Sequence, residues 1–479
     1  MKAIGVLGTA SNVGKSWLVT ALAAWLRRQG IRVAPFKAQN MSNNSYVTLE
    51  GGEIGRAQAV QAQACGLRPI VAMNPILLKP SQGKSQLVVL GSAQGHFTAV
   101  DYYAQIPELW QVVVDCLEFW RQECDVLLLE GAGSPVELNL MTRDIVNLRP
   151  IVYLQGKWLL VGDIERGGVF AQLIGTYYLL PARVQAEGLG VVVNKFRGDL
   201  RLFREAKDYF AQYIPTKYLG VIPFAKDLQP ESEDSLCYDQ EVGGNGEIIA
   251  CVRFPYLSNS QDILPWRQDQ GVKTVWVQSP NQLQNAKVII LPGTKDTIAD
   301  LLWLRATNLD QAIMAAYQNG AVIIGICGGY QMLGQIISDP TGNGGVAGEI
   351  AGLGLLPVRT VFHKHKIVKQ VEIEYKSDHW QAYEIHMGET YPLADMECLR
   401  ECNQKIYTHN QRVWGTYIHG LFESPHLRTT IAHLAHLENY RAHPQPWQKQ
   451  QAELYDRMAS FIEYYLDLEP IWAYVENCH

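Results

Sequence analysis

Short apolar runs alternate with amphipathic, helix-like stretches through the first half of the chain. The apolar runs are continuous, as expected for strands that are covered on both faces of a sheet. These predicted strands are residues 3–7, 32–36, 126–129, 159–161 and 190–193. The predicted helices between them are residues 15–29, 56–65, 108–122 and 202–214. This alternation predicts an α/β domain with a doubly wound parallel sheet, whose functional sites lie at the carboxyl ends of the strands.

The pattern changes near residues 226–246, which are first acidic, then glycine-rich, and without periodicity. Such a stretch is typical of a connection between domains. A second alternation follows, with predicted strands at 248–254, 287–291 and 321–325 and further strands near 370–375 and 382–386. We therefore predict two doubly wound parallel-sheet domains, residues 1–230 and 247–442, joined by a linker at 231–246. The tail, residues 443–479, contains a helical run at 448–466 that we expect to pack on the second domain.

Composition narrows the class of protein. The 479 residues contain 41 Lys+Arg and 47 Asp+Glu, a net charge of −6 that disfavours a general nucleic-acid binder. No apolar run approaches the roughly 18–20 residues that cross a bilayer, and the first apolar run does not resemble a signal peptide. Nine cysteines, an odd number without Cys-x-x-Cys pairs, suit a reducing compartment. We expect a cytoplasmic protein that acts on small molecules, without nucleic-acid or membrane partners.

A glycine-rich loop, Gly8-Thr-Ala-Ser-Asn-Val-Gly-Lys-Ser16, joins the first predicted strand to the first predicted helix. Backbone N–H groups in such a loop surround phosphate oxygens, while the lysine reaches the β- and γ-phosphates and the serine hydroxyl holds Mg²⁺. Its first glycine lies one position earlier than the strict Walker pattern requires, and the alternative is an ordinary strand-to-helix turn. The residues predicted to bind ATP are Thr9, Asn12, Val13, Gly14, Lys15 and Ser16.

Other polar residues follow predicted strands of the same domain. Glu130 ends one strand before a glycine turn, where a carboxylate can join Ser16 in holding Mg²⁺ or can cap the turn. Asp163 ends another strand, and binding and turn roles are equally favoured there. Lys37 and Asn40 belong to the polar string Lys37-Ala-Gln-Asn-Met-Ser-Asn-Asn-Ser45, whose composition suits a ligand carrying carboxylates or amides.

The second domain carries a candidate nucleophile. Cys327 lies between glycines, after an apolar strand and before a helix, as in a nucleophile elbow; the alternative is a buried structural cysteine. The Gly328 N–H, and the Gly293 N–H in Leu291-Pro-Gly-Thr-Lys-Asp296, are candidates for an oxyanion hole. His419 follows a β-type run and precedes a glycine, so it is the candidate base.

A nucleotide loop and a thiol nucleophile in one chain predict two reactions in series. The thiol site would release ammonia from glutamine through a thioester. The ATP site would activate a carboxylate as an acyl phosphate, which ammonia then attacks. ATP, Mg²⁺ and glutamine are therefore the expected small molecules, with no bound cofactor of the protein's own.

Long sequence strings make the resemblance specific. The C-terminal half resembles class I glutamine amidotransferase domains, with Cys327 and His419 at the positions of the nucleophile and base. The N-terminal half is similar to the dethiobiotin-synthetase-like P-loop fold. Together they resemble the cobyric acid synthase family of the cobalamin pathway. The matching strings are the one at 37–45, Glu53-Ile-Gly-Arg-Ala-Gln-Ala, Asp144-Ile-Val-Asn, Asp163-Ile-Glu-Arg-Gly-Gly-Val-Phe, Leu291-Pro-Gly-Thr-Lys-Asp and Tyr383-Glu-Ile-His-Met-Gly.

The resemblance implies ATP- and glutamine-dependent amidation of the b, d, e and g carboxylates of adenosylcobyrinic acid a,c-diamide.

The chain departs from most class I amidotransferases at one position. Leu421 stands where they carry a glutamate two residues after the histidine. This departure, shared by the cobyric acid synthase branch, predicts a Cys–His dyad or a ring oriented by Glu423. Two alternative functions stay open from sequence: a cobyrinic acid a,c-diamide synthase, and a P-loop partition or assembly ATPase whose second domain serves only for interaction.

Overall fold

The computed structural model describes residues 1–81, 83–231, 246–340, 342 and 347–476. The chain forms two compact units that interleave along the sequence. The first unit contains Met1–Ser42, Ile54–Glu231 and Gln451–His479, and the second contains Asn43–Glu53 and Ser232–Gln450. Most of the predicted linker, residues 232–245, lies outside the described residues.

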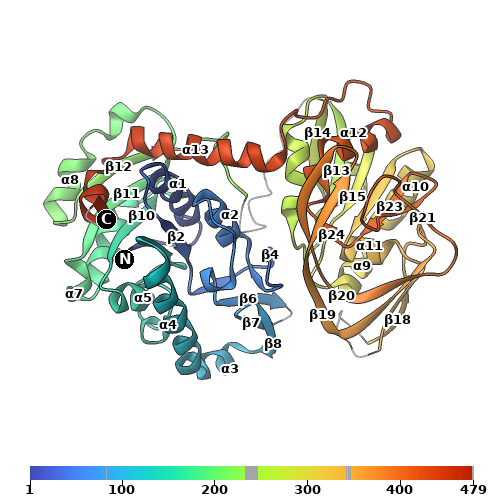
Figure 1. Ribbon diagram of the computed structural model, residues 1–479. Coiled ribbons are helices and arrows are strands. Elements are labelled where there is room, and N and C mark those ends of the chain that lie inside the picture. The colour runs from blue at the N-terminus through green and yellow to red at the C-terminus, as the bar shows by residue number, and fades with distance from the viewer. Residues whose placement is uncertain (82, 232–245, 341, 343–346, 477–479) are drawn as a thin grey trace. The chain divides into compact units, whose positions relative to one another are not determined.

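The first unit is built on a six-stranded parallel sheet in the order β12-β11-β10-β1-β9-β2 (Figure 1). The central strand, β1, is buried from Ala3 to Gly8, as its continuous apolar sequence predicts. The strands are β1 (Lys2–Gly8), β2 (Val33–Phe36), β9 (Val126–Glu130), β10 (Lys157–Asp163), β11 (Gly188–Phe196) and β12 (Tyr218–Pro223).

Helices cover both faces of this sheet, which confirms the doubly wound α/β prediction. Neighbouring residues of one strand face opposite cores, with Leu128 in one apolar cluster and Leu127 in the other. The cluster that contains Leu128 includes side chains of α1 (Lys15–Arg28) and α2 (Arg56–Ala64). The cluster that contains Leu127 includes side chains of α4 (Ile106–Glu123), α5 (Leu148–Tyr153), α6 (Val169–Leu179) and α8 (Ala206–Tyr213).

A small second sheet was not predicted from the sequence. It runs in the order β3-β6-β7-β8, with β3 pairing parallel to β6 and the other pairs antiparallel. Its strands are β3 (Gln39–Met41), β6 (Ile76–Ser81), β7 (Lys84–Val89) and β8 (Ser92–Phe97).

The prediction that the tail packs on the second domain is wrong. Helix α13 (Trp447–Tyr465) belongs to the first unit from Gln451 onwards, as does α14 (Glu469–Val475). Met458 and Ile462 are fully buried in the same apolar cluster as Leu18 and Leu22 of α1. The apolar stripe of α13 identified a helix that needs a partner surface, but the stripe alone does not name that partner.

The second unit contains a seven-stranded sheet in the order β14-β13-β15-β16-β23-β22-β21. The first five strands pair in parallel, and β22 and β21 add an antiparallel edge. The strands are β13 (Glu247–Val252), β14 (Val272–Val277), β15 (Ala286–Leu291), β16 (Val322–Ile326), β21 (Glu397–Cys398), β22 (Tyr407–His409) and β23 (Val413–Thr416). The helices include α9 (Thr297–Ala306), α10 (Leu309–Gln318), α11 (Gly328–Leu333) and α12 (Pro425–Leu434).

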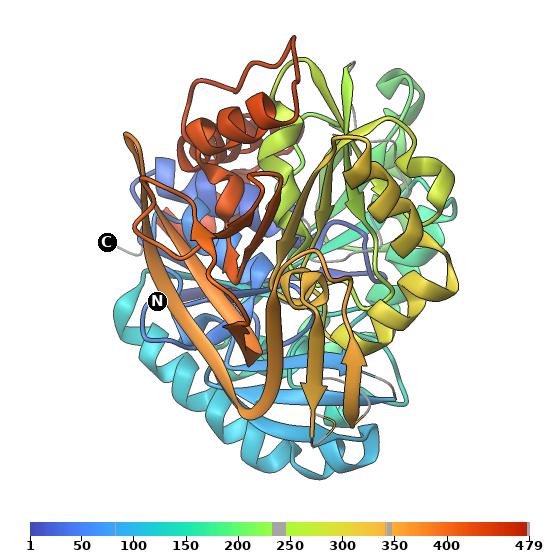
Figure 2. The same ribbon diagram turned by 90° about the vertical axis from the view of Figure 1, so that its right-hand side faces the viewer.

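A five-stranded sheet, β18-β17-β19-β20-β24, completes the second unit. Its largest part is the long antiparallel hairpin of β19 and β20, drawn in orange in Figure 2. These strands are β17 (Ile336–Asp339), β18 (Gly348–Ala351), β19 (Val358–Tyr375), β20 (Asp378–Pro392) and β24 (Ile418–His419). The short strand β24 carries His419 and pairs with Tyr383 and Glu384 of β20, so the hairpin helps to hold the candidate base.

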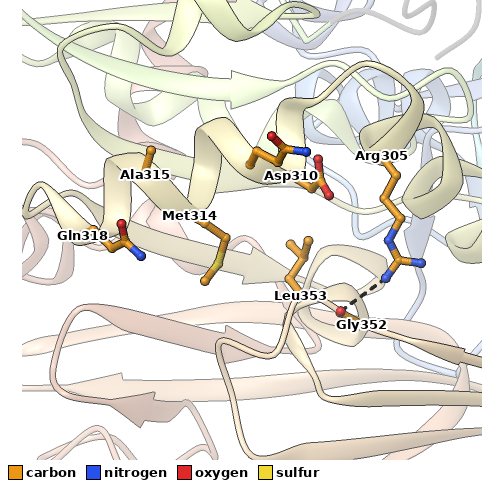
Figure 3. A pocket seen from close by; sticks show the side chains of 8 residues that line it. Arg305, Asp310, Met314, Ala315, Gln318, Gly352 and Leu353 are labelled. Carbon is orange, nitrogen blue, oxygen red and sulfur yellow. Dashed lines mark hydrogen bonds between the residues drawn. The ribbon is translucent and has the colours of Figure 1, made fainter.

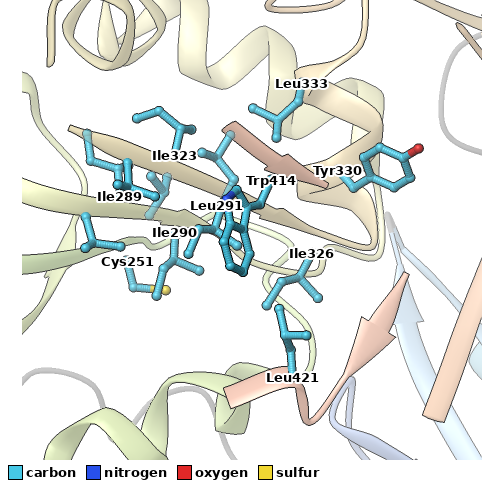
Figure 4. Packing of buried hydrophobic residues seen from close by; sticks show 14 of the residues in the cluster. Cys251, Ile289, Ile290, Leu291, Ile323, Ile326, Tyr330, Leu333, Trp414 and Leu421 are labelled. Atoms are coloured by element: carbon cyan, nitrogen blue, oxygen red, sulfur yellow. The ribbon is translucent and has the colours of Figure 1, made fainter. Parts of the chain in front are cut away.

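The core of the second unit is one apolar cluster centred on β15 and β16 (Figure 4). Leu421 is fully buried in it, beside Ile326 in the close-up. An ionised glutamate at position 421 would sit unpaired among apolar side chains, which is costly. Among the described residues, no helix combines the length and the apolar character needed to cross a bilayer.

Candidate active sites

The predicted phosphate-binding loop lies at the carboxyl end of β1. Helix α1 begins at Lys15 after Gly14, whose φ of 102° is in the left-handed region. A Cβ on Gly14 would lie 2.0 Å from the Asn194 amide nitrogen, so glycine is required there. The Lys15 ammonium donates to the carbonyl oxygens of Ala10 (2.9 Å) and Gly133 (3.0 Å). This cation and the N-terminal N–H groups of α1 suit an anionic phosphate.

Glu130, at the end of β9, is the centre of a buried polar network. Its Oε1 accepts hydrogen bonds from the Ser16 hydroxyl and the Lys37 ammonium, each at 2.8 Å. Its other oxygen accepts a hydrogen bond from the Gln61 amide. Burial by itself raises the pKa of Glu130, but Lys37 and the hydrogen bonds outweigh burial and hold that pKa below its ordinary value. The carboxylate is therefore ionised.

The donor set around Glu130 fits Mg²⁺. A serine hydroxyl and an ionised carboxylate are hard oxygen ligands, and Mg²⁺ commonly takes one or two of these together with substrate phosphates and water. In the part of the chain that the structure describes, no group of three or more His, Cys, Asp or Glu side chains is gathered as a metal site. Ser16 and Glu130 are thus the residues that would hold Mg²⁺ with a nucleotide, where the cation would neutralise phosphate charge.

The carboxyl ends of β10 and β11 contact the other side of the loop. The Lys195 ammonium bonds to Asp163 Oδ2 (3.0 Å) and to the Asn12 carbonyl (2.6 Å). The Asn194 amide donates to the Val13 carbonyl (2.8 Å). Asp163 therefore lies beside the phosphate-binding loop, where it holds Lys195.

Two other predicted residues have partners outside the Glu130 network. The Thr9 hydroxyl donates to the Gln172 side chain at 3.1 Å, and the Asn40 amide donates to the Gln58 side chain at 2.8 Å. Gln61 was not predicted from sequence, because it lies in no recognisable motif, whereas Lys195 belongs to the string Asn194-Lys-Phe-Arg-Gly-Asp199, which directly follows a predicted strand.

In the second unit, Cys327 sits at a strained turn between β16 and α11. Its φ of 54° and ψ of −112° are unusual for a residue with a side chain, as expected at a nucleophile elbow. The turn requires glycine beside it, because a Cβ on Gly329 would lie 1.9 Å from the Leu291 carbonyl oxygen. The Cys327 sulfur is mostly buried and lies 3.4 Å from the Ile385 carbonyl oxygen.

The two glycines predicted for an oxyanion hole lie around this turn. A Cβ on Gly328 would be 3.2 Å from the Thr294 nitrogen, so the loop after β15 lies against the start of α11. A Cβ on Gly293 would be 3.0 Å from the His419 ring. The structure therefore brings the backbones of Gly293 and Gly328 to the same place as Cys327 and His419.

His419 is fully buried and bonded on both ring nitrogens. Its Nδ1 lies 2.7 Å from Asp262 Oδ2, and its Nε2 lies 3.1 Å from the Asn259 amide nitrogen. Burial by itself lowers the pKa of His419, but the Asp262 carboxylate and the Cys327 sulfur outweigh it and raise that pKa to about 10. The thiol, the imidazole and the carboxylate therefore influence one another's charge.

Asp262 was not predicted from the sequence, from which a Cys–His dyad or a ring oriented by Glu423 was expected. The acid that bonds to Nδ1 comes from the segment Ser260–Gln268, 157 residues before the histidine. Its second oxygen accepts the Gly420 N–H at 2.9 Å, so it fixes both the ring and its backbone. The available signal was the polar string at 258–262, which follows the predicted strand at 248–254 and so falls at the active edge of a parallel sheet.

A separate pocket beside α10 contains none of the predicted site residues (Figure 3). Arg305, Asp310, Met314 and Leu353 line it, and the Arg305 guanidinium donates to the Gly352 carbonyl at 3.4 Å. We assign it no part in the chemistry.

Two family models match the chain, one on each half. Residues 4–236 match the CobQ/CobB/MinD/ParA nucleotide-binding domain, and residues 248–427 match the CobB/CobQ-like glutamine amidotransferase domain. Solved structures match single halves only weakly. A glutamine amidotransferase (14% identity, TM-score 0.31) covers 40% of this chain and 100% of its own. MinD of Aquifex aeolicus (15%, TM-score 0.29) covers 48% of this chain and 84% of its own.

Curated relatives match almost end to end. The chain is 43% identical to cobyric acid synthase of Herpetosiphon aurantiacus, over 96% of this chain and 95% of that one. It is 42% identical to cobyric acid synthase of Gloeobacter violaceus, over 98% of each chain. With both domains matched and identity above 40% along nearly the whole length, the chain belongs to the cobyric acid synthase family of glutamine-dependent amidating enzymes.

Proposed function

We propose that this protein amidates the b, d, e and g side-chain carboxylates of adenosylcobyrinic acid a,c-diamide, with glutamine as the nitrogen source and ATP as the activating reagent. The observation that supports this most directly is the presence of two chemically distinct groups in one chain. One is the Cys327–His419–Asp262 group, and the other is the phosphate-binding loop with Glu130.

At the thiol site, His419 takes the proton of Cys327, and the sulfur attacks the amide carbon of glutamine. The Gly293 and Gly328 N–H groups stabilise the resulting oxyanion. Return of the proton from His419 to the leaving nitrogen releases ammonia and leaves a thioester. Water, activated by the same ring, then hydrolyses the thioester to glutamate. Asp262 holds the Nδ1 proton, so Nε2 faces the reaction.

At the ATP site, a corrinoid carboxylate attacks the γ-phosphorus, giving an acyl phosphate and ADP. Ammonia attacks the acyl carbon, and inorganic phosphate leaves with formation of the amide. Lys15 neutralises charge on the phosphates, and Lys37 is placed by Glu130 beside the loop. Mg²⁺ held by Ser16 and Glu130 would neutralise further phosphate charge.

Substrate choice is tested by incubating the protein with ATP and glutamine and either cobyrinic acid or adenosylcobyrinic acid a,c-diamide. We expect mass spectrometry to show successive amidation of the diamide to the hexa-amide, with glutamate and ADP formed in step. Conversion of cobyrinic acid alone would contradict the proposal and would favour an a,c-diamide synthase instead.

The role of Asp262 is tested by Asp262→Asn. Removing the carboxylate charge removes the main cause that raises the pKa of His419, so burial then lowers that pKa and the ring becomes a weaker base. An asparagine amide also allows the other tautomer of the ring. We expect kcat/KM for glutamine to fall by about 10²–10⁴-fold, measured as glutamate release across a range of pH.

Synthesis from added ammonium chloride is the matched control for Asp262→Asn, because Asp262 takes no part in the ATP site. Wild-type glutaminase activity in a folded Asp262→Asn variant would remove Asp262 from the mechanism.

A further inference from the structure

Residues 43–53, here called the inserted segment, come from the N-terminal half of the chain but belong to the second unit. The segment includes β4 (Ser45–Val47), which pairs with β5 (Glu53–Gly55). The buried Glu53 carboxylate accepts hydrogen bonds from the Ser45 hydroxyl (2.7 Å) and from Lys366 on β19. The Gln370 amide donates to the Val47 carbonyl at 2.7 Å. These contacts hold the segment to the β19–β20 hairpin.

Ser45 fixes the orientation of the Asn259 side chain, which contacts His419 Nε2. The Ser45 N–H donates to Asn259 Oδ1 at 3.1 Å, so the Asn259 amide must direct its nitrogen towards His419 Nε2, 3.1 Å away. An N–H donor at that position favours the tautomer in which Nε2 is an acceptor and the proton sits on Nδ1, where Asp262 accepts it. This tautomer takes the Cys327 proton on Nε2 once the Asn259 N–H moves off that lone pair, because the acceptor nitrogen of a neutral imidazole has only one.

The Ser45 carbonyl contacts Tyr383, which is a second residue in contact with His419. The Tyr383 hydroxyl donates to the Ser45 carbonyl at 3.1 Å and accepts a hydrogen bond from Gln261 at 2.7 Å. The Tyr383 ring stacks on the His419 ring, with centroids 5.2 Å apart and planes at 21°. Val47, fully buried, packs with Tyr383 and with Ile385, whose carbonyl contacts the Cys327 sulfur.

We propose that the inserted segment positions the glutamine-hydrolysing site: Ser45 sets the orientation of Asn259, and Asn259 holds His419 in the tautomer that accepts the thiol proton. Ser45 and Asn259 are positioning residues, and the inference rests on the proposed roles of Cys327 and His419. The titratable groups beside the ring are Asp262, Cys327 and Tyr383. The second unit therefore takes one part of this site from a segment that lies in the N-terminal half of the sequence.

The residues that flank the inserted segment in sequence belong to the ATP site. Lys37 precedes the inserted segment and Gln61 follows it, and both donate hydrogen bonds to Glu130 in the ATP site. One continuous stretch, residues 37–61, therefore supplies the partners of the candidate magnesium ligand and the group that orients the glutaminase base.

The first test is Asn259→Asp in the full-length chain. Aspartate tolerates the φ of 53° at this position and can still accept the Ser45 N–H, but it has no donor for His419 Nε2 and places a negative charge against that nitrogen. We expect kcat/KM for glutamine at neutral pH to fall about tenfold or more. We expect the pH profile of Cys327 alkylation by iodoacetamide to differ from that of wild type, because the new carboxylate lies against the ring that takes the thiol proton.

The second test compares Ser45→Pro with Ser45→Ala. Proline removes the N–H that orients Asn259, and alanine removes only the hydroxyl, so the proline variant is expected to lose about tenfold more kcat/KM for glutamine. Ammonia-dependent synthesis should be retained in both. Leu49→Ala, at an exposed position of the same segment, is the control that should match wild type.

The outcomes separate this inference from the proposed function. If Cys327→Ala keeps glutaminase activity, the proposed thiol chemistry is wrong. If Cys327→Ala loses it, while Asn259→Asp keeps both the wild-type rate and the wild-type alkylation profile, the positioning role is wrong and the thiol chemistry stands. Equal losses in Ser45→Pro and Ser45→Ala would also overturn the role of the Ser45 N–H.

Discussion

Replacing Cys327 by alanine is expected to abolish glutamine-dependent synthesis and to leave ammonia-dependent synthesis close to wild type. The thiol is the only group of the elbow that can form a thioester, so its loss should lower glutamate release by about 10⁴-fold or more. Alanine keeps the Cβ at the strained turn, where φ is 54°, and removes only the sulfur. The measurements are glutamate release and amide formation, each with glutamine or with ammonium chloride.

Cys327→Ser is the matched control for this experiment, because it keeps a hydroxyl of similar size that His419 activates poorly. If ammonia-dependent synthesis also disappears from a variant whose circular dichroism is unchanged, the division of labour between the two units is wrong. If glutamine-dependent synthesis survives, the second unit acts in some way other than through its thiol.

Lys15→Ala is expected to abolish synthesis with either nitrogen source. The Lys15 ammonium bonds to the carbonyls of Ala10 and Gly133 and is the cation of the loop itself. Removing a group that stabilises transition-state charge costs about 10²–10³-fold, and loss of ATP binding adds to that. The measurements are amide formation and ADP release, with ATP affinity from calorimetry.

The control for Lys15→Ala is the rate of Cys327 alkylation by iodoacetamide, which reports on the second unit and should not change. Turnover with ammonia in the Lys15→Ala variant would remove the loop from the mechanism. Lys15→Arg separates charge from shape, because the guanidinium keeps the charge but does not fit the same two carbonyls.

The features that can be predicted from the sequence are those encoded by neighbouring residues. The phosphate-binding loop is a strand, a glycine-rich turn and a helix in direct succession, and the turn around Cys327 has the same form. Backbone conformation at such turns depends on which residues lack a side chain, so Gly14 and Gly329 mark them in the sequence. Continuous apolar runs likewise predicted the parallel sheets, because strands covered on both faces have no polar side.

Only the tertiary structure decided which distant residues meet. Asp262 and His419 are 157 residues apart, and no periodicity or motif relates them. The C-terminal helices were assigned to the wrong unit, because an apolar surface specifies that it will be covered without specifying by what. The inserted segment was assigned to the first unit because it is continuous with that unit in sequence. The sequence by itself predicted the two chemistries, the candidate nucleophile and the phosphate loop. The fold alone determined what orients the base, since hydrogen bonds such as those of Asn259 and Asp262 to His419 exist only once separate strands and loops have packed together.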